Sequence, residues 1–112
     1  MIIYLADRHM NIVATCSNNL PKGLKFQNDL KSEDVESGVA TFSVDILYDE
    51  EDAVKTAQYC ESGNYVLVYD DNGENGFYTI IEAENDRKEH SINIYAEDGG
   101  LVTVLDFDDY PM

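Results

Sequence analysis

Residues 64–96 carry the clearest secondary-structure pattern in the chain and read NYVLVYDDNGENGFYTIIEAENDRKEHSINIYA. Residues 65–69 are wholly apolar or aromatic, as in a strand rich in β-forming side chains. Residues 70–76 then collect Asp, Asn and Gly, which favour turns, before residues 77–81 resume the apolar pattern. This order predicts a β-hairpin.

A third strand follows the hairpin after a second polar break at residues 84–90. Ile92, Ile94 and Ala96 alternate with polar or aromatic neighbours at the two-residue period of a strand that buries one face. The whole stretch therefore predicts three consecutive antiparallel strands joined as a meander.

Upstream of the meander, the sequence predicts one long strand and one short helix. In residues 39–48 the large apolar side chains fall on one face: Phe42, Val44, Ile46 and Tyr48. A helix is expected over residues 50–60, with the Asp49 carboxylate as N-cap and a stop at residues 61–63. Its expected buried face is Ala53, Val54, Ala57 and Cys60.

The ends of the chain give weaker patterns. Residues 2–6 and 11–16 predict an opening hairpin around a polar turn, and residues 17–23 read as a loop. Residues 26–36 fit either a ragged strand or a helical turn, and we favour the strand. Residues 101–107 fit a strand or the start of a helix.

These elements together predict a mainly β fold. We expect residues 1–112 to form a single domain, an antiparallel barrel-like meander of about seven strands with one short inserted helix.

The charge of the chain excludes one class of partner. It has 23 acidic and 7 basic residues, a formal net charge of −16. Phosphate backbones are bound through Lys and Arg that displace counterions, so we expect no stable nucleic-acid binding. No apolar run approaches the ~20 residues that a membrane span needs, so no membrane partner is expected.

Few residues offer catalytic chemistry. His9 and His90 both fall in predicted polar turns, where a surface histidine is the ordinary interpretation. Cys16 and Cys60 are isolated and lack metal-ligand spacing, so we expect buried small hydrophobic side chains, with a disulfide left open. The sequence predicts no catalytic residue and no cofactor.

Acidic residues raise the question of a metal site. The run Asp70-Asp71-Asn72-Gly73-Glu74 is rich in oxygen ligands, but its spacing does not fit a calcium loop. The pairs Asn72-Gly73 and Asn75-Gly76 are better explained as turns that tolerate positive φ. Other carboxylates read as a solvated face: Glu82, Glu84, Asp86, Asp106, Asp108 and Asp109. We therefore predict no metal site.

Several short segments, taken in order, carry a resemblance to a known family. They are residues 1–5, 36–44, 63–68, 77–82 and 94–101. Together they resemble the N-terminal region of phage minor structural proteins, the tail-associated proteins of long-tailed phages and prophages of Gram-positive bacteria. Members are often labelled prophage tail endopeptidase or antireceptor.

The resemblance implies a place in a virion tail. It implies a tail-hub domain that forms a ring, commonly a trimer, below the tail tube. Its partners would be the distal tail and tail-tube proteins, and host cytoplasm would be its location during assembly. Family members are several times longer, so the chain is expected to be an N-terminal fragment or a short relative. Receptor-binding or lytic regions would then lie farther along the polypeptide.

Three functional hypotheses follow. The first is a structural tail-tip module with no enzymatic activity of its own, which presents an acidic concave surface to passing DNA. The second is a fragment of a cell-wall peptidase, suggested by the family label alone. The third is an acidic module that mimics DNA or masks a basic protein.

Overall fold

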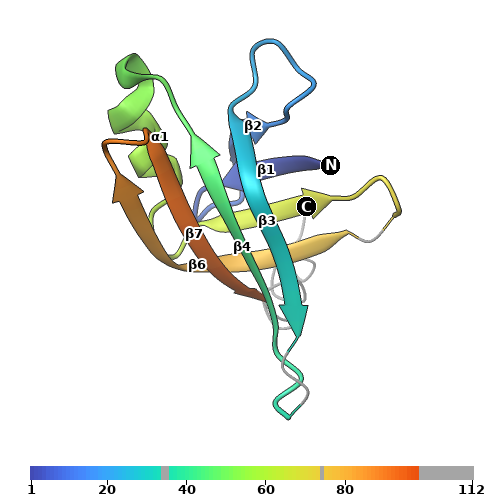
Figure 1. The fold of residues 1–112 in the computed structure, drawn as a ribbon. Helices are drawn as coiled ribbons and strands as arrows, with labels where there is room; N and C mark the ends of the chain where they lie inside the picture. The colour runs from blue at the N-terminus through green and yellow to red at the C-terminus, as the bar shows by residue number, and fades with distance from the viewer. Residues whose placement is uncertain (34–35, 74, 99–112) are drawn as a thin grey trace.

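The computed structural model describes residues 1–33, 36–73 and 75–98. Within them the chain forms seven strands, one 3-10 turn and one short helix (Figure 1). The elements in order are β1 (Ile2–Ala6), β2 (Ile12–Cys16), β3 (Lys25–Glu33), β4 (Ala40–Leu47), η1 (Glu50–Asp52), α1 (Ala53–Tyr59), β5 (Tyr65–Tyr69), β6 (Gly76–Asp86) and β7 (Ser91–Asp98). The expectation of a mainly β chain with one inserted helix is confirmed.

All seven strands belong to one antiparallel sheet, in the order β2-β1-β5-β6-β7-β4-β3. The sheet curls into a half-barrel, so that β3 and β4 cross over β1 and β5 in the view of Figure 1. Its two edge strands approach each other at the β2–β3 connection, where Ser17 N–H donates to the Leu24 carbonyl at 2.8 Å, Leu24 N–H donates to the Thr15 carbonyl at 3.0 Å and Phe26 N–H donates to Asn18 Oδ1 at 3.0 Å.

The predicted meander is confirmed as β5, β6 and β7, which are neighbours in the sheet. Both later strands are longer than expected. The polar residues 84–86, predicted as a break, continue β6 because each pairs with a residue of β7. Glu97 and Asp98 likewise extend β7. Cross-strand pairing overrides the low β propensity of these acids.

The core lies inside the curl. Phe42, Val44, Ile46 and Tyr48 face inward as predicted, and all are at least nine-tenths buried. The inward residues of β7, Ile92, Ile94 and Ala96, are buried as predicted. The remaining apolar core comes from the other strands and the end of α1: Ile3, Leu5, Ala6, Cys16, Phe26, Cys60, Val66, Val68, Tyr78 and Ile80.

The inserted helix differs from its prediction in two respects. Asp49 makes no side-chain cap; instead its carbonyl accepts from Asp52 N–H at 2.9 Å, and this closes a 3-10 turn before α1. Val54, expected in the core, is 73% exposed, while Thr56 is fully buried. The helix packs by its Thr56 and Cys60 side because the adjoining strands, not its own apolar spacing, set its orientation.

One predicted turn is also wrong. Gly73 has φ +81° and supports the Asn72-Gly73 turn, but Gly76 is the first residue of β6. A Cβ at Gly76 would lie 2.5 Å from the Tyr78 ring, so the glycine is explained by close packing and not by positive φ.

The remaining elements of the N-terminal half agree with prediction. The opening hairpin is β1–β2, and residues 26–36 were correctly favoured as a strand, observed as β3. A bulge between Gln27 and Leu30, with Asn28 at φ +57°, explains the ragged pattern. The predicted element at residues 101–107, with Asp106, Asp108 and Asp109, lies outside the described residues.

Among the described residues, no helix has the length and apolar character to cross a bilayer.

The core predicts a clear contrast between two single substitutions. Phe42 is fully buried and stacks on Tyr78 with ring centroids 5.4 Å apart, so Phe42→Ala should lower the free energy of unfolding by about 3–5 kcal/mol. Leu30 lies on the outer face of β3, which pairs with β4, and is 62% exposed. Leu30→Ala should therefore change the free energy of unfolding by less than ~0.5 kcal/mol. Urea unfolding followed by circular dichroism measures both; equal losses would contradict the described core.

Candidate functional site

A groove of about 450 Å³ lies between α1 and the tip of the β6–β7 hairpin. Figure 1 shows the helix at this end of the curl, next to the end of β6. Its lining residues are Tyr48, Glu50, Ala53, Val54, Ala57, Gln58, Glu61, Asn85, Arg87 and His90. We call it the α1 groove.

The floor of the α1 groove is held by Tyr48. Its hydroxyl donates to Asn85 Oδ1 at 2.7 Å, and its ring stacks on His90 with centroids 5.7 Å apart. Tyr48 N–H also donates to the His90 carbonyl at 3.0 Å. These contacts fix the β6–β7 turn against the end of β4, with His90 in the left-handed region at φ +51°.

The two walls of the groove differ in chemistry. The helix wall is apolar, with Val54 exposed between Ala53 and Ala57. The opposite wall is the polar end of β6, represented by Asn85, with Arg87 just beyond it. A ligand lying between them would meet apolar side chains on one side and hydrogen-bonding groups on the other.

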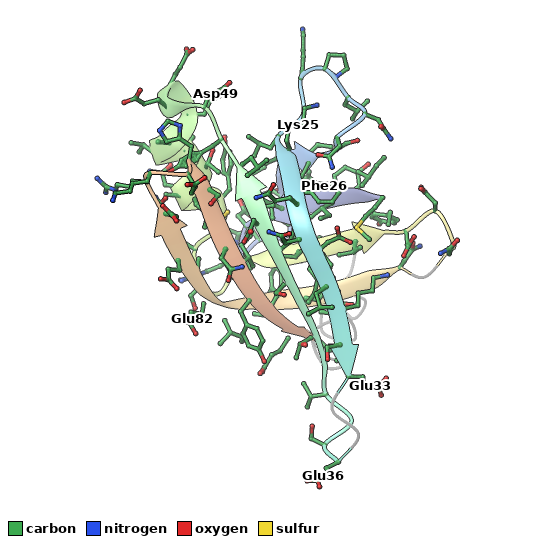
Figure 2. All side chains as sticks on the ribbon, in the orientation of Figure 1. Lys25, Phe26, Glu33, Glu36, Asp49 and Glu82 are labelled. Carbon is green, nitrogen blue, oxygen red and sulfur yellow. The ribbon has the colours of Figure 1, made fainter. Side chains whose placement is uncertain are left out.

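The outer face of the sheet is acidic around β6 and β7. Glu82, Glu84 and Asp86 pair with Tyr95, Asn93 and Ser91, so they project on the side opposite the buried Ile92 and Ile94. We call these three residues the outer acidic row; Figure 2 shows Glu82 on the outside of the sheet.

Tyr95 connects the outer acidic row to β7. Its hydroxyl donates to Glu97 Oε2 at 3.2 Å. Desolvation, followed by the Glu97 and Glu82 carboxylates, raises the pKa of the Tyr95 phenol because each disfavours a second negative charge. Among the described residues the inside of the curl is the apolar core, so the outer acidic row lies on the opposite face of the sheet. The acidic surface expected toward passing DNA would belong to the assembled ring and stays a prediction.

The two histidines occupy turns, as predicted, and both are exposed. His9 N–H donates to Asp7 Oδ1 at 2.9 Å in the β1–β2 turn, where hydrogen bonds led by that from Asn11 N–H lower the pKa of Asp7. His90 lines the α1 groove, which the sequence did not indicate. The groove joins residues about 30 to 40 positions apart in the sequence. The available sequence signal was the two-residue period of the acids in β6, which is typical of a strand.

Both cysteines are buried core residues, as predicted, and both are free thiols. Burial raises the pKa of Cys16 to about 12 and that of Cys60 to about 12; the nearby Cys16 contributes to the second shift. A thiol of this pKa is almost fully protonated at neutral pH, which disfavours nucleophilic chemistry.

The acidic loop after β5 is held by two ion pairs. Asp70 Oδ2 accepts from Lys31 Nζ at 3.1 Å, and Asp71 Oδ1 lies 3.2 Å from the amino terminus. The first pair joins the edge strand β3 to the β5–β6 turn across the open side of the curl. Within residues 1–33, 36–73 and 75–98, no three His, Cys, Asp or Glu side chains are grouped to hold a metal ion.

Comparison of the chain with protein families, with curated proteins and with solved structures finds no match. The resemblance to phage tail proteins therefore remains an expectation from the sequence.

The buried thiols predict slow labelling. At pH 8 a thiol with a pKa of about 12 is ionised in about one molecule in ten thousand, so Cys16 and Cys60 should react with Ellman's reagent only as the protein unfolds. In urea both should react within the mixing time. Rapid labelling of either residue under native conditions would contradict their burial.

The Lys31–Asp70 pair predicts a pH-dependent contribution to stability. The hydrogen bond from Lys31 holds the pKa of Asp70 below its ordinary value of 3.8. Asp70 therefore stabilises the fold above that value, and the contribution is lost as the pH falls through the lower folded-state pKa. The wild type should therefore have a larger free energy of unfolding than Asp70→Asn at pH 7, and this difference should disappear below pH 3.8.

Asp71→Asn is the matched control for this experiment. The Asp71 side chain is 90% exposed and lies next to Asp70, so its removal should change stability little at any pH. Urea unfolding at a series of pH values tests both variants. A constant gap for Asp70→Asn, or an equal gap for Asp71→Asn, would refute the assignment.

Proposed function

We propose that this chain is a structural module of a phage or prophage tail tip, which oligomerises below the tail tube and anchors receptor-binding or lytic regions. In this role residues 1–112 contribute contacts and no catalytic step. In the virion it would form a trimer with other copies of itself. Its other partners would be the distal tail and tail-tube proteins.

The observation that carries the proposal is an aromatic patch on the outer face of β1, β5 and β6. The outer aromatic patch consists of Tyr4, Tyr65, Leu67, Tyr69 and Phe77, which share one side of the sheet by their pairing. Tyr4 meets Tyr69 edge-on at 5.4 Å, and Tyr65 stacks on Phe77 at 5.2 Å. Tyr69 is still 44% exposed.

An aromatic outer face is unusual for a sheet that meets only water. Antiparallel sheets with one solvated side carry polar residues there. In a chain with a net charge of −16, four aromatic side chains and one leucine are nonetheless grouped on this face, and such patches favour subunit contacts.

The open edges of the sheet give further support. β2 and β3 are opposite edges of the same sheet, and each carries an exposed apolar side chain, Ile12 at 52% and Leu30 at 62%. Pairing of one edge with the opposite edge of the next copy is a head-to-tail contact, the kind that closes rings.

Particles released from a strain that carries this gene provide the test. Antibodies raised against residues 1–112 should label the distal tip of the tails in immunogold electron microscopy. Tyr69→Lys should lower incorporation at least tenfold, since a buried lysine at a subunit contact is left unpaired. Val39→Lys, at a site 38% exposed in the β3–β4 connection, is the control. Absence of the chain from purified tails would refute the proposal.

The outer acidic row favours a second candidate, an acidic module that covers a basic DNA-binding protein. Carboxylates at every second residue of β6 present negative charge along one line, as a phosphate backbone does. Release of DNA from a basic protein by this chain, lost in Glu82→Gln/Glu84→Gln, would favour this reading over the tail role.

A further inference from the structure

Among the residues that the structure describes, the end of β6 is paired on one side only. β5 pairs with β6 as far as Thr79, and the last bonds on that side run from Ile80 N–H to the Asn64 carbonyl and from Gly63 N–H to the Ile80 carbonyl, both 2.8 Å. Ile81 is the extra residue of a bulge in β6, and among the described residues Glu82 to Asp86 pair only with β7. Alternate backbone N–H and C=O groups along this stretch therefore point away from the sheet.

The helix α1 takes the place that a further strand would occupy. The chain leaves the sheet at Gly63 and leads back through Glu61 to α1, so the helix lies across the α1 groove from Asn85, near the end of the free edge of β6. A groove between a strand edge and a helix is a geometry in which an extended peptide is bound as an added strand.

We propose that the α1 groove binds an extended protein segment of alternating apolar and basic residues, which adds as a strand to the free edge of β6. The backbone of the segment would pair with residues 81–86. Its apolar side chains would turn into the groove against Ala53, Val54 and Ala57. Its basic side chains would fall on the outer face, beside the outer acidic row.

Charge complementarity decides the occupant. Glu82, Glu84 and Asp86 stand two residues apart on one face, the same period as the side chains of an added strand. Glu50 and Glu61 add negative charge at the groove, Arg87 adds one positive charge to its lining, and the exposed Lys55 and Lys88 lie next to lining residues in the sequence. An acidic strand, such as a second copy of β6, would be repelled by the same row.

The exposed valine supports the apolar half of the pattern. Val54 is 73% exposed on a helix whose other side is packed on the core, and it lines the groove. Successive side chains of a strand point to opposite faces, so one bound segment can contact the apolar helix wall with one set of side chains and the outer acidic row with the other. The inference does not depend on the tail-tip role.

Synthetic peptides of about nine residues, long enough to span the free edge, test the proposal. A labelled peptide of alternating valine and lysine should bind the whole chain in fluorescence anisotropy, and alternating valine and glutamate should not. The double variant Glu82→Lys/Glu84→Lys should bind the glutamate peptide more tightly than the lysine peptide. Its affinity for the lysine peptide should be at least about tenfold lower than that of the wild type. Val54→Arg should also weaken it about tenfold, while Val39→Arg, far from the groove, should not.

Amide hydrogen exchange separates strand addition from simple ionic attraction. The lysine peptide should slow exchange of edge amides within residues 81–86, and a version with proline at its centre should neither protect them nor bind as tightly. Equal binding of the proline peptide, or binding without protection of these amides, would overturn the proposal. Self-association of the chain that is lost in Val54→Arg would also overturn it, in favour of a second copy.

Discussion

The structure depends on the alternation of side chains along β7. This strand lies between β6 and β4 and pairs with both over most of its length, so its register sets theirs. A slip of one residue would turn Ile92, Ile94 and Ala96 to the outside and bring Asn93 and Tyr95 into the core. Six further strands curl around the apolar face that this alternation defines. The side chains that alternate with the core residues lie on the outer face.

Described carboxylates lie outside the curl or make specific contacts, which limits their mutual repulsion in a chain with a net charge of −16. Asp45, for example, accepts from Asn28 and Asn93, both at 2.8 Å, on the outer face. Asp70 is used to connect β3 with the β5–β6 turn where the two sheet edges stay apart. The outer face thus carries the outer aromatic patch over β1, β5 and β6 and the outer acidic row at the end of β6, so contacts made by the two would differ in chemistry.

The sequence was sufficient for what depends on local periodicity. Period-two alternation predicted the meander, the inward face of β4 and the strand character of β3. Local patterns failed for Val54, which the helical spacing placed in the core, and for residues 84–86, which their polarity placed in a turn. The orientation of a seven-residue helix and the extension of β6 are decided by partners distant in the chain. The α1 groove could not be predicted for the same reason: Tyr48, Val54 and Asn85 meet only after the sheet has curled.

The inserted helix explains why the groove and the free edge occur together. Had residues 53–61 continued β5 as a strand, they would have paired with β6 beyond Ile80 and sealed its edge. As a helix they leave one edge of residues 82–86 without a partner strand among the described residues, and Val54 lines the groove beside Asn85. Carboxylates at Glu82, Glu84 and Asp86 then protect the edge from joining another acidic strand, which is how natural sheets limit unwanted pairing. The same charges leave the edge open to a strand of opposite sign.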